Sequence, residues 1–194
     1  MAFIAAIQHN LKNLTNFRGR ETVGIYWPYA GLVLGLILLV SMIGMAASFG
    51  GMIEDIEALA AENPDAVHIE RSPGHYSATI APGSGVMPDV SAIFIPMGVS
   101  VFIGALLLAA ATTRRLHDRG LTGFLALAPV ALLFSGMAIF SILFSQFDTG
   151  EPDLRLFAAG FVNNIAYLLC LVLLLVQLAG ASTTKPTKHG PIPD

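Results

Sequence analysis

The sequence has few charged residues and only one cysteine. Aspartate, glutamate, lysine and arginine make up 12% of the 194 residues, about half the share that is usual in a soluble globular domain. With Cys170 as its single cysteine, the chain cannot form an intrachain disulfide or a cysteine-rich metal site. Its basic residues number only ten, which is too few to support nucleic-acid binding.

Charged residues are absent altogether from four long stretches, at residues 22–53, 90–113, 120–147 and 156–184. Each stretch exceeds the roughly 20 apolar residues with which an α-helix crosses a bilayer. The sequence therefore predicts an all-α membrane protein with four transmembrane helices, at about residues 25–48, 92–113, 124–147 and 157–179. The segment before the first stretch is interrupted by polar residues, so we expect no cleavable signal peptide.

The charges that remain alternate in sign from one gap to the next. Eight of the ten basic residues precede the first stretch, separate the second from the third, or follow the fourth. Ten of the thirteen acidic residues lie in the other two gaps. Because basic residues accumulate in cytoplasmic loops, both termini and the loop at 114–119 are predicted to be cytoplasmic.

Two terminal segments flank the predicted membrane domain at 18–180. Residues 1–17 carry apolar side chains at helical spacing opposite polar ones, which predicts an amphipathic helix. This helix either lies in the membrane interface or packs on the cytoplasmic side of the bundle. The tail at 181–194 is rich in proline and is predicted to be disordered.

The loop at 49–89 is the only sizeable extracytoplasmic insertion. We expect a short amphipathic helix that ends at Asn63-Pro64, followed by a β-hairpin with strands at 66–70 and 75–80. In that hairpin His68 and His75 are predicted to face each other loosely. Their spacing matches no defined metal site, so we interpret them as surface histidines and expect no metal.

Three amides lie within the fourth stretch, namely Asn163, Asn164 and Gln177. Amides inside a membrane usually face the bundle interior and bond to another helix. A path for a polar substrate would show the same residues. We favour packing, and expect Asn163 and Asn164 to point at other helices and not at lipid.

The loop between the second and third stretches holds the densest group of polar side chains, with Arg114, Arg115, His117, Asp118 and Arg119 within six residues. If the preceding helix continues to Asp118, then Arg114, His117 and Asp118 share one face, and Asp118 pairs with Arg114 or orients His117. Gly120 suits a helix end. The positive-inside rule accounts for the arginines but not for the histidine, the aspartate or the glycine.

This loop carries a family resemblance. Arg114-Arg115-Leu116-His117-Asp118-Arg119-Gly120-Leu121-Thr122-Gly123 resembles the signature of an uncharacterised bacterial inner-membrane family, domain of unknown function 805, with Thr122 in place of a serine and Phe124-Leu125 in place of tryptophans. A second motif, Phe17-Arg18-Gly19-Arg20 with Tyr26-Trp27 after it, also matches. The resemblance covers about residues 16–180. It implies the architecture and a bacterial inner-membrane location, and no activity.

We predict that Arg20 approaches this loop, with Asp118 supplying one negative charge and Glu21 another if it turns inward. Guanidinium groups bind phosphate bidentately, so the candidate site is one for anionic lipid headgroups or a protein partner. It comprises Arg20, Arg114, Arg115, His117, Asp118 and Gly120. Membrane lipids, a protein partner or a second copy of the chain are the expected partners.

A non-enzymatic membrane protein without cofactors is the favoured interpretation. No nucleophile stands out beside His117, so no catalytic residue is assigned. One alternative is a small transporter or channel subunit, which the absence of charged residues from the spans disfavours. A membrane-interface enzyme acting on a lipid or phosphate ester, with His117 as acid or base, is the third interpretation.

Overall fold

The structure is a computed structural model that describes residues 3–81, 91–146, 153–187 and 190. Four of its helices are long and apolar enough to cross a membrane, so the predicted all-α membrane protein with four spans is confirmed. The elements in chain order are α1 (Phe3–Lys12), α2 (Val23–Glu62), β1 (Val67–Ser72), β2 (His75–Ile80), α3 (Ser91–Asp118), the 3-10 turn η1 (Gly123–Ala126), α4 (Leu127–Gln146) and α5 (Leu154–Ala179).

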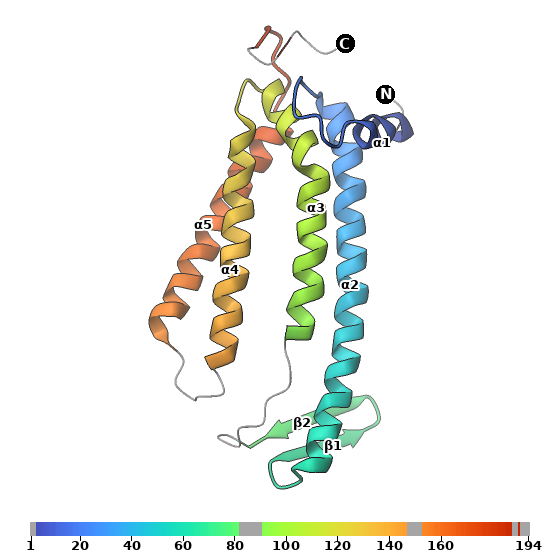
Figure 1. The fold of residues 1–194 in the computed structure, drawn as a ribbon, viewed down its shortest axis with the longest axis vertical. Helices are drawn as coiled ribbons and strands as arrows, with labels where there is room; N and C mark the ends of the chain where they lie inside the picture. The colour runs from blue at the N-terminus through green and yellow to red at the C-terminus, as the bar shows by residue number, and fades with distance from the viewer. Residues whose placement is uncertain (1–2, 82–90, 147–152, 188–189, 191–194) are drawn as a thin grey trace.

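The four long helices form two pairs, in which α2 lies along α3 and α4 lies along α5 (Figure 1). We call the end of the bundle that carries α1 and the segment after α5 the terminal end, and the opposite end, which carries the β-hairpin, the hairpin end. The pairs approach each other at the terminal end and diverge toward the hairpin end (Figure 1). The main apolar core therefore lies near the terminal end, where Tyr26, Tyr29 and Val33 of α2 pack with Leu116 and Leu178.

α2 is longer than a membrane span requires. Its 40 residues correspond to about 60 Å of helix, roughly twice the hydrocarbon thickness of a bilayer. The short helix expected beyond residue 49 is the last part of α2, because Gly50-Gly51 lowers helix propensity without breaking the backbone. The helix ends at Glu62, where Asn63-Pro64 was predicted to end it.

The predicted hairpin follows α2 and is joined by Pro73-Gly74, with Gly74 at φ +78°. A positive φ of this kind favours glycine. The predicted facing of His68 and His75 is wrong, because the antiparallel register places His68 opposite Thr79 and His75 opposite Ser72. The two imidazoles therefore lie at different positions along the ladder. The glycine-rich segment after β2 lies largely outside the described residues.

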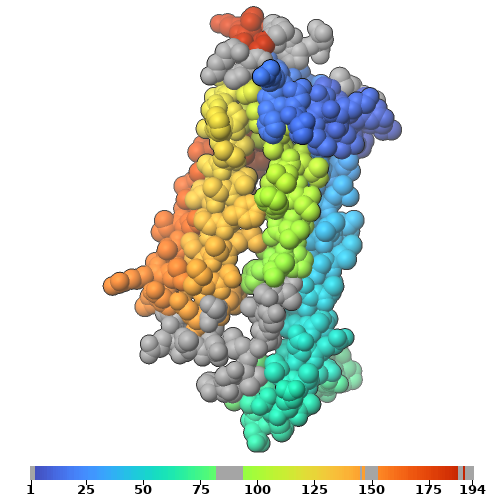
Figure 2. Space-filling view, viewed as in Figure 1, coloured from blue at the N-terminus to red at the C-terminus, as the bar shows by residue number. Residues whose placement is uncertain are grey.

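α1 lies across the terminal end, at a steep angle to α2 (Figure 1). Its Ala6 and Asn10 are buried against the bundle, whereas Phe3, Ile4 and Leu11 are exposed. The space-filling view shows α1 extending beyond the side of the bundle (Figure 2). The helix therefore packs on the bundle through one face and presents an apolar face outside it.

Candidate functional site: an arginine network at the terminal end

The end of α3 places the predicted site residues. The helix continues through Arg114 and Arg115 to Asp118 and closes with two bonds, from Leu121 N–H to the Leu116 carbonyl and from Gly120 N–H to the His117 carbonyl, both 2.9 Å. Gly120 has φ +76°, as a residue just beyond a helix C-terminus often does. The predicted helix end at Gly120 is thus confirmed.

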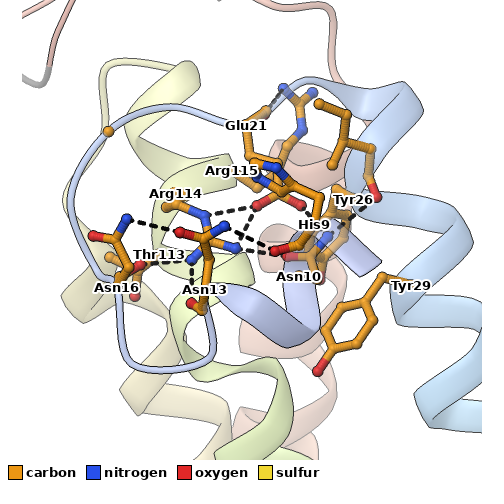
Figure 3. A network of polar contacts seen from close by, with 12 residues as sticks. His9, Asn10, Asn13, Asn16, Glu21, Tyr26, Tyr29, Thr113, Arg114 and Arg115 are labelled. Carbon is orange, nitrogen blue, oxygen red and sulfur yellow. Dashed lines mark hydrogen bonds and ion pairs between the residues drawn. The ribbon is translucent and has the colours of Figure 1, made fainter. Parts of the chain in front are cut away.

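Arg114 points toward α1 and the start of α2 (Figure 3). Its Nε donates to Glu21 Oε2 at 2.8 Å, and Nη2 donates to Asn10 Oδ1 at 2.6 Å. Its Nη1 donates to the carbonyls of Asn13 and Asn16, at 2.9 and 2.5 Å. With 3% of its surface exposed, the guanidinium of Arg114 is surrounded by acceptors from the protein itself.

Asn10 and Glu21 close this half of the network. Asn10 Nδ2 donates to Glu21 Oε1 at 2.8 Å, so the Glu21 carboxylate accepts bonds on both oxygens. The Glu21 N–H also donates to the Arg114 carbonyl at 3.2 Å. These bonds fix α1 and the beginning of α2 to the end of α3.

Arg115 points the other way, toward the C-terminal end of α5. Its Nε donates to the Leu178 carbonyl at 2.9 Å, and Nη2 donates to the Gly180 carbonyl. The last carbonyls of a helix have no partner within the helix, and the positive charge is also favourable at the negative end of the helix dipole. Arg115 therefore caps α5, and its side chain is fully buried.

Asp118 joins Arg115 to Arg20. Its Oδ2 pairs with Arg115 Nη1, while its Oδ1 accepts from Arg20 Nε and Nη2 at 3.1 and 3.0 Å. The predicted approach of Arg20 to this loop is thus confirmed. The expected pair of Asp118 with Arg114 is not formed, because the Arg114 guanidinium turns to Glu21 and leaves Asp118 to Arg115 and Arg20.

The C-terminal segment is held by the same network. Arg20 donates from Nη2 to the Thr183 carbonyl at 2.7 Å and from Nη1 to the Lys185 carbonyl at 3.1 Å. Arg119 donates to the Ala181 carbonyl at 2.6 Å. In residues 181–187, the described start of the tail that composition predicts to be disordered, these bonds to arginines order the backbone.

His117 takes no part in an Asp118 pair. Its Nδ1 lies 3.2 Å from the Gly19 carbonyl oxygen, to which it donates when that nitrogen is protonated. The expectation that Asp118 orients His117 is therefore wrong, since both Asp118 oxygens face guanidinium groups. Gly120 contributes the turn and is exposed.

Charge is nearly balanced within the network. Three guanidinium groups, of Arg20, Arg114 and Arg115, meet two carboxylates, of Glu21 and Asp118, which leaves a formal charge of +1 (3 − 2). Both carboxylates are 0% exposed. A buried ion pair gains little over an apolar pair, but removal of one partner leaves an uncompensated buried charge. The network thus favours one arrangement of these segments.

The sequence prediction found the charged members of this network but missed Asn10 and the carbonyl acceptors of the C-terminal segment. Asn10 is one of several polar residues in its helix, and its partner Arg114 is 104 positions away. Backbone carbonyls carry no sequence signal. The position of Glu21 does indicate its role in the network, because it is one of the few acidic residues in the segments where basic residues predominate.

Comparison with models of known protein families identifies the family of the chain. A family model described as "Protein of unknown function (DUF805)" matches residues 14–191, nearly the whole chain. The matched region contains Arg20, Glu21, the end of α3 and the segment after α5, whereas Asn10 precedes it. No curated protein and no solved structure matches the chain.

Proposed function

The chain belongs to the DUF805 family of proteins of unknown function, and we propose that it is a non-enzymatic bacterial inner-membrane protein whose cytoplasmic face binds anionic lipid headgroups. In this proposal the terminal end is cytoplasmic, in keeping with the positive-inside rule. The observation that carries the proposal is that α1 is fixed across the terminal end with its apolar face exposed beside exposed cations.

The surface of the terminal end is basic because its described carboxylates are buried. Glu21 and Asp118 are enclosed by the arginine network, whereas Lys12, Arg18 and Lys185 are exposed. The hairpin end shows the opposite surface, with exposed Glu54, Asp55, Glu62, Asp65 and Glu70. This asymmetry supports both the orientation and an attraction of the terminal end to anionic headgroups.

α1 has the properties of an interfacial helix. Phe3, Ile4 and Leu11 are 57%, 66% and 52% exposed, and Lys12 ends the helix with an exposed ammonium group. A helix of this kind lies with its apolar face among the headgroups and acyl chains. Because Asn10 is bonded to Arg114 and Glu21, the helix is held where the first membrane span begins.

Within this proposal, the predicted site residues divide into two roles. Arg114, Arg115 and Asp118 hold the surface in place, since their polar atoms are directed at the protein. Headgroup contact is assigned to Lys12 and Arg18 at the rim. It stays a prediction that the residues of the candidate site themselves contact a headgroup or a partner. These residues are Arg20, Arg114, Arg115, His117, Asp118 and Gly120.

The test is lipid retention. The protein is reconstituted in bilayers of phosphatidylcholine with phosphatidylglycerol, extracted, and its bound lipids are measured by native mass spectrometry. Wild-type protein is expected to enrich phosphatidylglycerol, and Lys12→Gln/Arg18→Gln to lose most of that enrichment. Arg71→Gln/Arg155→Gln is the matched control, because it removes the same charge from exposed positions at the hairpin end.

The orientation of each variant is checked by labelling a His75→Cys derivative from outside the cell. Equal enrichment of phosphatidylglycerol in both double variants would overturn the headgroup proposal. Retention of an acidic protein in place of lipid, lost only in the Lys12→Gln/Arg18→Gln variant, would assign the same surface to a protein partner and would also overturn it.

A further inference from the structure

A cavity of about 160 Å³ lies between α3, α4 and α5, away from the arginine network. Its walls are mostly apolar, with Phe94 and Met97 of α3 and Phe140 of α4 among them. Three polar side chains of α5, Asn163, Asn164 and Tyr167, also line it. Because Asn164 and Tyr167 are three apart on one helix, their side chains are neighbours.

These two side chains differ from the adjacent Asn163. Asn163 Oδ1 accepts from Ser135 Oγ at 2.7 Å, and its Nδ2 donates to the Leu132 carbonyl at 2.9 Å, so its amide bonds to α4 as predicted. Between described residues, the Asn164 amide and the Tyr167 hydroxyl make no hydrogen bond, and Asn164 is exposed. A polar group without a partner is unfavourable in hydrocarbon, so an outside partner would stabilise both.

The depth of the cavity limits what that partner is. Asn164 lies ten residues after Leu154, where α5 begins, which is about 15 Å along the helix and about half the thickness of the hydrocarbon core. Phospholipid headgroups lie outside that core. The partner is therefore a molecule whose polar group lies inside the bilayer.

The size and chemistry of the cavity limit the partner further. A cavity of about 160 Å³ is close to the roughly 150 Å³ that holds one benzene molecule, so it accommodates a single ring and not a whole helix of a second copy. The Asn164 amide and the Tyr167 hydroxyl both offer hydrogens to an acceptor. None of the described residues that line the cavity is charged, which favours a neutral ligand.

We propose that this cavity is a lateral binding site for an isoprenoid quinone, which combines a flat ring, carbonyl oxygens and an apolar tail. The side chains of Asn164 and Tyr167 donate to the ring carbonyls, and Phe94 and Phe140 contact the ring. The tail extends between the helix pairs into the bilayer. Concave, mostly apolar sites with a few placed polar groups are typical of small-molecule binding. This site is independent of the headgroup surface at the terminal end.

The test compares two probes that have the same tail. Decylubiquinone carries ring carbonyls, whereas decylbenzene has none, and binding of each to protein in lipid nanodiscs is measured by equilibrium partitioning. Wild-type protein is expected to prefer the quinone. Asn164→Leu and Tyr167→Phe should each weaken quinone binding by about three- to tenfold, the effect of one neutral hydrogen bond, and leave decylbenzene binding unchanged.

Val162→Leu is the control on the same helix, because Val162 is 65% exposed and does not line the cavity. It should bind both probes as wild type does. Equal binding of the two probes to the wild-type protein would overturn the proposal, as would quinone binding unchanged in Asn164→Leu/Tyr167→Phe. If Asn164→Leu instead abolished self-association and quinone did not bind, the amide would belong to an interface between copies, which also overturns the proposal.

Discussion

Different interactions stabilise the helix packing at the two ends of the bundle. At the terminal end, hydrogen bonds and ion pairs from Arg20, Arg114 and Arg115 join α1, α2, α3 and the segment after α5. In the hairpin half, the helices contact each other mainly through apolar side chains. Within the pairs, Ser41 bonds to Ser100 at 2.8 Å, and Asn163 bonds to Ser135 and to the Leu132 carbonyl at 2.7 and 2.9 Å. Between described residues there, no side-chain hydrogen bond joins one pair to the other.

This difference has a physical consequence in a membrane. Lipid tails are as apolar as the helices, so burial from water does not drive the two pairs together in the bilayer. Directional polar bonds fix the terminal end, whereas between the two pairs in the hairpin half the described residues make only van der Waals contacts. The cavity lined by Asn164 lies in the part that has no polar bond across the pairs. The protein thus combines a rigid end with a half that has room for a ligand.

The largest expected effect comes from the rigid end. Arg115→Met removes the cap of α5 and one of the two partners of the buried Asp118 carboxylate. We expect the free energy of unfolding to fall by about 3–5 kcal/mol, as when one member of a buried ion pair is lost. Denaturant unfolding in detergent, followed by circular dichroism, measures the change.

Arg115→Lys serves as the companion variant, because it keeps the charge but loses the planar array of donors. It should insert normally and recover only part of the lost stability. If Arg115→Met lowered the free energy of unfolding no more than replacement of an exposed arginine does, the arginine network would not stabilise the terminal end. The proposed difference between the two ends would then be wrong.

The sequence predicts the secondary structure and the membrane spans of this molecule better than it predicts the polar network. Runs without charge predict the spans, because hydrophobicity is a property of each segment alone. Turn residues predict the hairpin and the helix end at Gly120. The bonds of Asn10 to Arg114 and of Arg20 to Thr183 join segments that are distant in the chain, and no local pattern encodes them. Which of the two arginines, Arg114 or Arg115, pairs with Asp118 likewise depends on Glu21. Glu21 binds Arg114 and lies 93 residues before it.

The second prediction compares packing within a pair with packing between pairs. A Cβ added at Gly104 of α3 would lie 1.9 Å from Ile37 Cδ1 of α2, whereas one added at Gly98 would lie 3.0 Å from the terminal methyl of Met137 in α4. Gly104→Ala should cost about 1–3 kcal/mol, as overpacking does. Gly98→Ala should cost less, since a flexible side-chain end can move.

The measurement is the unfolding midpoint of the two variants in the same detergent. Gly31→Ala is the control, because a Cβ there meets nothing within 4 Å. Equal losses in Gly98→Ala and Gly104→Ala would indicate that the two pairs are packed against each other as tightly as the helices within a pair.

The third prediction separates the two adjacent asparagines of α5. Asn163→Leu removes the bonds to Ser135 and Leu132 and should lower stability by about 1 kcal/mol, as for other hydrogen bonds between membrane helices. Asn164→Leu should leave the ligand-free protein unchanged or slightly more stable. Unfolding of both variants in lipid-free detergent tests this, and a larger loss in Asn164→Leu would contradict it.

The smallest expected effect lies at the hairpin end. Arg71 pairs with Glu57, but the two side chains are 60% and 42% exposed, and Arg71 also lies 5.8 Å from the centre of the Tyr76 ring. Exposed ion pairs contribute about 0–1 kcal/mol because water screens them and ordering the side chains costs entropy. We therefore expect Arg71→Met to lower the free energy of unfolding by about 1 kcal/mol or less.

Salt distinguishes the pair of Arg71 and Glu57 from the arginine network, because ions screen exposed charges far more than buried ones. Unfolding at low and high sodium chloride should show the effect of Arg71→Met disappearing while that of Arg115→Met persists, and a loss of both with salt would mean that the two ends are held by the same kind of interaction.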